Sequence, residues 1–140
     1  MHQVEKTTLL AALLASCPAE HRIVTVEETF ELAVVAPDAV ALQGRQPSLE
    51  GTGAVSLRRL VKEALRMRPD RLVVGEVRDA EALDLLLALN TGVPGAATIH
   101  ANSAMDVPAR LIALGALAGM NEAVVAAQAS SALDAVIHVE

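Results

Sequence analysis

The sequence predicts an α/β fold, a mostly parallel β-sheet with helices flanking it. Short apolar runs rich in β-branched residues alternate with longer helical patterns, which is typical of strand–helix–strand units. One run, Leu72–Val77, is continuously apolar, as expected for a strand that is covered on both faces. Hydrophobic residues make up 53% of the chain and Phe30 is the only aromatic residue, so the core must be aliphatic. Small aliphatic side chains allow helices to pack closely on a sheet.

Proline and serine mark the element boundaries in the first half of the chain. Pro18 ends a helix rich in leucine and alanine, Ser56 caps the next helix, and Pro69 ends it. The expected elements are a helix over Lys6–Cys17, strands over Arg22–Glu27 and Val40–Leu42, a polar loop over Gln43–Val55 and a helix over Ser56–Met67. This order predicts right-handed crossovers between parallel strands.

The second half continues the alternation. Gly92 is expected to close a helix in the left-handed position, and Asp106 with Pro108 opens another. The expected elements are strands over Leu72–Val77, Ala96–His100 and Ala135–Val139, and helices over Asp79–Gly92, Asp106–Gly119 and Asn121–Leu133. The chain has 140 residues and no linker of low complexity, so a single domain is expected.

Charge and cysteine content exclude some classes of protein. The net charge is −6, which argues against non-specific binding of nucleic acid, and no nucleic-acid partner is expected. Cys17 is the only cysteine, so no internal disulfide can form. The N-terminus does not resemble a signal peptide and no apolar run spans a bilayer, so a cytoplasmic protein is predicted. A basic cluster is open to two interpretations, a solvated helix face or a contact with phosphate or another subunit; its members are Arg58, Arg59, Lys62, Arg66, Arg68 and Arg71.

Several predicted strands end in side chains that can carry chemistry. Because the carboxyl ends of parallel strands meet at one edge of a sheet, these groups are expected to lie together. They are Glu27, Glu28, Glu76, Thr98 and His100. Carboxylates there can ligate magnesium through water or orient the water that attacks a terminal phosphate. Each residue taken alone is more simply an ordinary surface group at a strand end, but the whole set favours a magnesium–phosphate site.

The segment Lys6-Thr7-Thr8 opens the first helix and matches the end of a phosphate-binding loop. In such a loop the lysine reaches the β- and γ-phosphates, and a hydroxyl such as that of Thr7 ligates magnesium. The glycines that should precede it are missing, and Glu5 occupies the place of the second one. The short motif by itself is therefore weak.

At this point several segments together resemble the nucleotide-binding core of the type II/type IV secretion and pilus ATPases, most closely the tight-adherence (Flp-type) pilus assembly branch. The segments occur in the family's order: KTTLL (Lys6–Leu10), RIVTVEETFEL (Arg22–Leu32), RQPSLEG (Arg45–Gly51), LRMRPDRLVVGEVRDAEALD (Leu65–Asp84) and ATIHANS (Ala97–Ser103). The resemblance implies a RecA-like P-loop NTPase core, here a partial C-terminal nucleotide-binding domain over residues 1–140. It also implies that the first strand, the glycine loop and the family's last elements are absent.

The resemblance assigns a role to each matching residue. Glu76 falls at the Walker B carboxylate that activates water and contacts magnesium, and His100 at the histidine that contacts phosphate. The remaining assignments are Lys6, Thr7 and Thr8 at Walker A, with Thr7 on magnesium, Glu27 and Glu28 in the acidic box, and Arg45 and Arg78 binding nucleotide or linking subunits. The implied cofactors are ATP and Mg²⁺. The implied partners are further copies in a hexameric ring and an inner-membrane platform protein, through which the motor lies at the membrane.

Departures from the family pattern leave two functions open. Glu28, Ser48, Val93 and Pro94 stand where the family usually has other residues, and Met1–Glu5 contains no glycine to wrap a phosphate. The first function is an ATP-hydrolysing motor for pilus assembly or secretion, present here as a fragment that is inactive alone. The second is a non-catalytic scaffold or interface remnant. A nucleotide-binding α/β protein with a metabolic substrate is disfavoured, because the acidic and histidine segments occur in the family's order.

Overall fold

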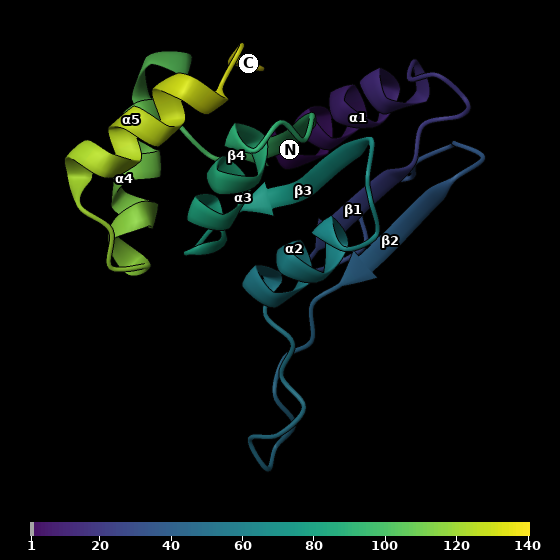
Figure 1. Ribbon diagram of the computed structural model, residues 1–140, viewed down its shortest axis with the longest axis horizontal. Helices are drawn as coiled ribbons and strands as arrows, with labels where there is room; N and C mark the ends of the chain where they lie inside the picture. Colours follow the sequence, from purple (N-terminus) through teal and green to yellow (C-terminus); the bar gives the residue numbers. More distant parts are fainter. Residues whose placement is uncertain (1) are drawn as a thin grey trace.

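The computed structural model describes residues 2–140, with side chains from residue 5 onward. At its centre lies a four-stranded sheet in the order β2-β1-β3-β4, in which all neighbouring strands are parallel (Figure 1). The strands are β1 (Ile23–Glu27), β2 (Ala39–Gln43), β3 (Arg71–Val77) and β4 (Gly95–Ile99). The predicted α/β fold with a parallel sheet and flanking helices is therefore confirmed.

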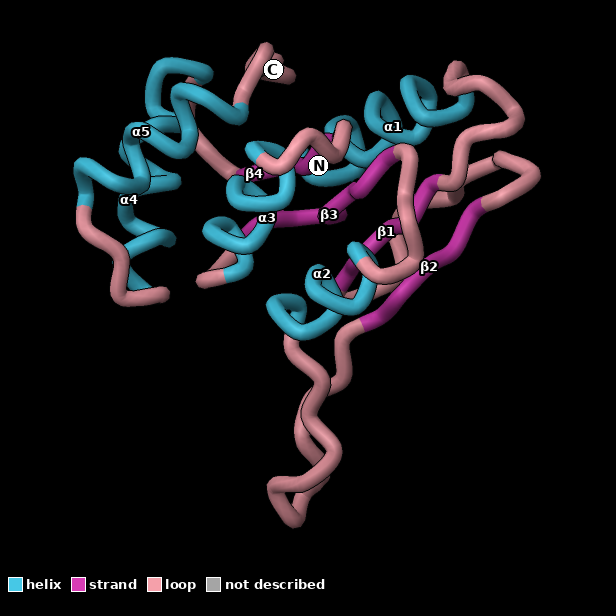
Figure 2. Tube along the Cα trace, in the orientation of Figure 1, coloured by secondary structure: helices cyan, strands magenta, loops and turns pink. Residues whose placement is uncertain are grey.

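Helices cover both faces of the sheet, and loops join them to the strands (Figure 2). They are α1 (His2–Ala15), α2 (Leu57–Leu65), α3 (Glu81–Asn90), α4 (Val107–Leu117) and α5 (Glu122–Ala132), with a short 3₁₀ turn η1 (Ala104–Asp106) before α4. Helix α1 lies on one face, whereas α2 and α3 lie on the other and α4 and α5 pack beyond α3 (Figure 1). The helices expected from the sequence are all present, with ends shifted by a few residues.

The two faces of β3 contribute to two separate apolar clusters. Leu72 and Val74 point into the larger cluster, which α2, α3, α4 and α5 cover. Val73 points the other way and packs with Leu10 and Leu14 of α1. Successive strand side chains alternate between faces, so this continuously apolar strand is buried on both sides. The buried strand predicted from the sequence is confirmed.

The strand predicted over Ala135–Val139 is wrong. Residues 133–140 carry no regular structure after α5 and, together with β4, line a groove of about 930 Å³. The segment thus faces β4 across the groove instead of pairing with it. A β-rich sequence becomes a strand only where a neighbouring backbone accepts its hydrogen bonds, and no ladder partner adjoins this segment among the described residues.

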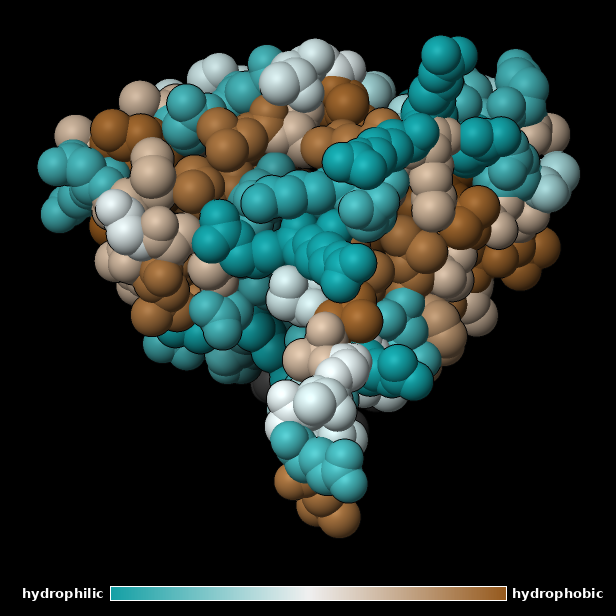
Figure 3. Space-filling model, turned by 60° about the horizontal axis from the view of Figure 1, so that its bottom comes forward, coloured by the Kyte–Doolittle hydropathy of each residue, from teal (hydrophilic) through white to brown (hydrophobic). Residues whose placement is uncertain are grey.

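The polar loop after β2 forms a projecting arm over residues 44–55 (Figures 1 and 2). Its base is closed by Arg45 and Val55, whose backbones exchange two hydrogen bonds of 3.0 and 2.9 Å. The tip bears apolar surface (Figure 3), and Leu49 is fully exposed. The sequence predicted a loop here but not its extension from the body of the protein.

One member of the basic cluster makes a contact inside the fold. Nε of Arg58 on α2 donates to Oδ2 of Asp84 on α3 at 2.7 Å, and the Asp84 side chain is only 7% exposed. The hydrogen bond and the negative charge of Asp84 raise the pKa of the Arg58 guanidinium above its usual value. Because a cation with a raised pKa loses its stabilising effect only as the pH rises through that value, the loss lies far above neutral pH.

Removing the arginine head group should therefore destabilise the fold over the whole working pH range. We expect Arg58→Met to lower the free energy of unfolding by about 1–3 kcal/mol, because Asp84 keeps a charge that has lost its partner. Arg59→Met, at the exposed neighbouring position on the same helix, is the matched control and should change it by about 0.5 kcal/mol or less. Urea unfolding of the three proteins measures both; equal effects of the two substitutions would contradict this account.

Among the described residues, no helix combines the length and the apolar composition needed to cross a membrane.

Candidate functional site

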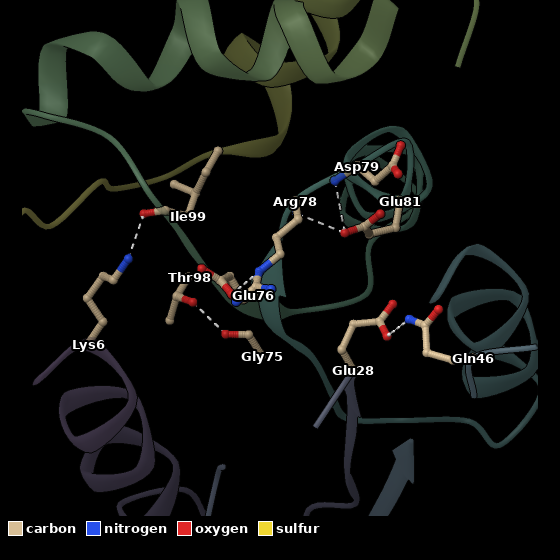
Figure 4. Close-up of polar contacts among 10 residues, drawn as sticks. All are labelled: Lys6, Glu28, Gln46, Gly75, Glu76, Arg78, Asp79, Glu81, Thr98 and Ile99. Atoms are coloured by element: carbon tan, nitrogen blue, oxygen red, sulfur yellow. Dashed lines mark hydrogen bonds and ion pairs between the residues drawn. The ribbon is translucent and has the colours of Figure 1, made fainter. Parts of the chain in front are cut away.

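The carboxyl ends of the strands meet at one edge of the sheet, as expected. The parallel register places the ends of β1, β3 and β4 there, and the chain continues from them into residues 28, 78 and 100. Figure 4 shows Glu76 beside Arg78 in the middle of this edge, Lys6 pointing toward Ile99 on one side, and Glu28 beside Gln46 on the other. Side chains far apart in sequence are thus brought along one rim.

Glu76 lies near the end of β3 and is 14% exposed. Its Oε2 accepts a short hydrogen bond from Nε of Arg78, whose side chain is 63% exposed. The following residues are held by the buried carboxylate of Glu81, whose Oε1 accepts from the backbone N–H groups of Arg78 (2.9 Å) and Asp79 (3.2 Å). These two bonds place a turn at residues 78–80, so α3 begins at Glu81 and not at Asp79 as expected.

A β-bulge includes Gly75 and Glu76. Val74 pairs with Ala97 and Val77 with Ile99, so two residues of β3 face the single residue Thr98 of β4. The buried Thr98 hydroxyl donates to the carbonyl oxygen of Gly75 at 2.5 Å. This side-chain bond satisfies a carbonyl at the interrupted part of the ladder.

Glu27 is placed at the edge but turned inward. Its side chain is 4% exposed, and Oε2 accepts from the backbone N–H groups of Glu31 (2.9 Å) and Leu32 (3.2 Å). It also lies against Gly75, where an added Cβ would come within 2.5 Å of Glu27 Cγ. The carboxylate thus shapes the turn after β1, and these contacts favour a positioning role; a catalytic role for Glu27 stays a prediction.

Glu28 and Arg45 line a shallow pocket of about 640 Å³ at the base of the arm. Glu28 is exposed, and its Oε2 accepts from Nε2 of Gln46 at 3.3 Å. Gly44 packs between this carboxylate and Leu57, each 3.4 Å from the position of an added Cβ. The structure therefore brings Glu28 and Arg45 together, on the arm side of the edge.

Lys6 lies on the opposite side, on α1. Its Nζ donates to the carbonyl oxygen of Ile99 at 3.3 Å, and it lines the groove beside β4 together with His100. Thr7 is half-buried and Thr8 is exposed on the same helix. Residues 2–5, which precede the lysine, continue helix α1 and form no loop, whereas Met1 lies outside the described residues. Lys6 thus lies at the edge of the sheet, no phosphate cradle surrounds it among the described residues, and its phosphate-binding role stays a prediction.

Two residues at this edge, Gly75 and Glu81, were missed in the sequence, whereas Thr98 was expected at the edge but its contact with Gly75 was not. Glu81 was overlooked although an acid one turn after a strand is a common capping signal, as in the order Asp79-Ala80-Glu81. The contributions of Gly75 and Thr98 depend on the register between β3 and β4, which no local pattern reveals. The described residues contain no group of three or more His, Cys, Asp or Glu side chains arranged to hold a metal ion.

An all-parallel sheet with a lysine, carboxylates and arginines along its carboxyl edge is the arrangement of α/β proteins that bind nucleotides. A family described as "Type II/IV secretion system protein" matches residues 5–139, and the chain belongs to this family. The predicted family is thus confirmed, and its ATPase members imply nucleotide binding.

Named relatives agree with this assignment. A putative conjugal transfer protein of Mycobacterium tuberculosis is 53% identical over 135 residues, which are 96% of this chain and 38% of the relative. The type IV secretion system protein VirB11 of Bartonella henselae is 41% identical over 101 residues, 71% of this chain and 28% of the relative. The crystal structure of the VirB11 ATPase of Brucella suis, in complex with sulphate, matches with a TM-score of 0.81 and 25% identity, over 94% of this chain and 38% of that one.

The chain therefore spans well under half the length of these relatives. They are conjugal-transfer and type IV secretion proteins, so the pilus-assembly branch stays a prediction. The individual roles of the site residues also stay predictions, since the contacts above establish positions and not activities.

Proposed function

We propose that this chain is part of the nucleotide-binding domain of an ATP-hydrolysing motor that drives secretion, conjugal transfer or pilus assembly. The single observation that carries the proposal is the shared edge on which Lys6, Glu76 and Arg78 lie. A carboxylate next to bound triphosphate can orient the attacking water, and cations neutralise the charge that develops during transfer. The sulphate-bound Brucella relative supports an anion site in this fold.

Each residue then has a distinct task. Glu76 orients the attacking water, and Lys6 binds the phosphates once Ile99 releases it. Arg78 and Arg45 are exposed and available to the nucleotide or to a neighbouring subunit, and His100 contacts phosphate from the end of β4. Glu28 carries the role of the acidic box on the arm side.

Magnesium is the implied metal, and the donor chemistry of two residues suits it. Mg²⁺ takes oxygen ligands and usually keeps several waters and phosphate oxygens in its shell, so one or two protein donors suffice. The hydroxyl of Thr7 and the carboxylate of Glu76 are such donors. Thr7 and Glu76 would hold the metal, which would supply Lewis-acid stabilisation of phosphate charge, and Glu76 would first have to exchange its contact with Arg78.

A second function, a non-catalytic scaffold or interface module, is favoured by one observation. Residues 2–5 are helical, so their backbone N–H groups are not arranged as a loop around an anion. In this case the chain keeps the fold and the side chains at the carboxyl edge of the sheet but does not hydrolyse ATP.

A titration of this chain with Mg-ATP separates the two functions. The motor proposal needs the preceding glycine loop, so we expect no micromolar binding by residues 1–140 alone. We expect binding by an extended protein, in which the segment that precedes the matched region in the mycobacterial relative is fused in front of this chain. If the extended protein does not bind Mg-ATP, the scaffold function is preferred; if the 140-residue chain binds at micromolar concentration, the argument from the missing loop is wrong.

Lys6→Ala provides a further check of the missing loop. In the 140-residue chain we expect ATP binding to be unchanged within experimental error, because the side chain contacts a carbonyl oxygen and no phosphate loop. In the extended protein the same substitution should weaken ATP binding about tenfold or more, since a lysine–phosphate bond is lost. Isothermal titration calorimetry of both pairs measures this; equal effects in the two proteins would contradict the interpretation.

The quaternary state and the location are proposed on the same basis. We place this domain in a ring of copies, hexameric as the resemblance implies, on the cytoplasmic side of the inner membrane and attached through a platform protein. The exposed arm with Leu49 at its tip is a surface on which such contacts can form.

A further inference from the structure

The bulge between β3 and β4 sets the direction in which Glu76 leaves the sheet. Glu76 follows Gly75 within the two residues that face Thr98 alone, so its direction depends on how the bulge is held. Bulges of this kind redirect side chains and are frequent next to active sites. Two contacts hold this one, from opposite sides.

The first contact is the hydrogen bond between Thr98 and Gly75. The donor is a side chain that is 8% exposed, and the acceptor is a buried carbonyl oxygen at 2.5 Å. Without the hydroxyl, the Gly75 carbonyl oxygen at the interrupted ladder would lose the side-chain donor that now bonds to it. A buried carbonyl that loses its partner destabilises the conformation that presents it.

The second contact comes from Glu27. Its side chain lies where a Cβ of residue 75 would be, with Cγ at 2.5 Å and Cδ at 3.0 Å from that position, so only glycine fits. The carboxylate is fixed in turn by the backbone N–H groups of Glu31 and Leu32. The bulge is thereby enclosed between β4 and the turn after β1, and it has little freedom to relax.

We propose that Thr98 is a positioning residue, whose hydroxyl fixes the Gly75–Glu76 bulge and thereby aims the Glu76 carboxylate along the carboxyl edge toward Arg78. Thr98 does not touch the reacting groups; it acts through the backbone of Gly75. The expected effect of Thr98 on ATP hydrolysis rests on the proposed function. The effect of Thr98 on the direction of Glu76 concerns this chain alone and can be tested without nucleotide.

The test compares Thr98→Val, which keeps the shape and removes the hydroxyl, with Thr98→Ser, which keeps the hydroxyl. Thr91→Val is the matched control, because its hydroxyl also donates to a backbone carbonyl oxygen, that of Ala88 at 2.7 Å, but at the end of α3. In the 140-residue chain, NMR follows the Nε–H signal of Arg78 and the hydrogen exchange of the Glu76 and Val77 amides. The hydroxyl proton of Thr98 is also sought in the unsubstituted protein.

We expect Thr98→Val to shift the Arg78 Nε–H signal. Amide hydrogen exchange at Glu76 and Val77 should become about fivefold to tenfold faster, because one buried hydrogen bond is lost. Thr98→Ser should restore both, and Thr91→Val should change neither. Unchanged signals in Thr98→Val, or failure of the serine to restore them, overturns the proposal. Should Thr98→Val not fold, the proposal still fails if the unsubstituted protein shows no slowly exchanging Thr98 hydroxyl proton.

A second arm uses the extended protein and separates this proposal from the proposed function. There we expect Thr98→Val to lower kcat about tenfold with an unchanged KM for ATP, and Thr98→Ser to recover it. If Glu76→Gln retains hydrolysis, the role proposed for Glu76 is wrong while the NMR result still decides the geometry. If Glu76→Gln abolishes hydrolysis and Thr98→Val turns over normally, the positioning role alone is wrong.

Discussion

Replacing Glu76 with glutamine in the extended protein is expected to leave ATP binding intact and to abolish hydrolysis. The amide has the shape of the carboxylate but carries no charge and cannot accept a proton from water at neutral pH. Loss of such a group typically lowers kcat by about a hundredfold to ten-thousandfold. Steady-state hydrolysis and equilibrium binding of ATP, measured on the same preparation, test the two parts of the expectation.

The control for this substitution must lose an ion pair without touching the site. Glu63→Gln does so, because Glu63 on α2 lies 3.9 Å from Arg66, the residue that follows this helix, and Glu76 is likewise paired with Arg78. We expect normal turnover in Glu63→Gln, since an exposed pair contributes about 0–1 kcal/mol. If Glu76→Gln hydrolyses ATP at the rate of this control, Glu76 does not have its proposed role. If Glu76→Gln loses ATP binding, the carboxylate contributes to binding of ATP in the ground state.

Truncating Leu72 is expected to have the largest effect on stability. Its side chain is fully buried in β3, in the middle of the cluster that joins the sheet to α2, α3, α4 and α5. A buried leucine replaced by alanine loses about 2–5 kcal/mol, the transfer free energy plus the cost of the cavity. The whole stability of a domain is about 5–15 kcal/mol, so Leu72→Ala brings this protein close to unfolding.

Leu13→Ala is the matched control, since Leu13 on α1 is 51% exposed. We expect its free energy of unfolding to change by about 0.5 kcal/mol or less. Urea denaturation followed by circular dichroism measures both variants at equal protein concentration. A Leu72→Ala protein as stable as Leu13→Ala would mean that the sheet does not pack as described.

Local patterns in the sequence were enough for most of the fold. The apolar run at Leu72–Val77, the caps at Ser56 and Asn121 and the left-handed Gly92 depend on neighbouring residues alone, and the structure has each of them. Gly92 has φ 94°, a conformation that glycine adopts at little cost. Because parallel strands share a direction, the sequence also predicted that Glu76 and the end of β4 would meet at one edge.

Contacts between segments that are distant in the sequence determine the features that local patterns did not predict. Glu27 and Glu28 are neighbours with the same side chain, yet the fold buries one against Gly75 and exposes the other beside Gln46. Residues 135–139 have the composition of a strand, but no strand in the described part of the chain pairs with them, so they stay irregular.

The sequence by itself determined the family, the order of the elements as far as α5 and the edge at which the candidate site residues lie, since these follow from periodicity, capping and motif order. Only the tertiary structure decided the direction of each carboxylate and the bulge at Gly75 and Glu76 with its hydrogen bond from Thr98. The physical reason is that hydrogen-bond register and burial are properties of pairs of segments, and a pair exists only after the chain has folded.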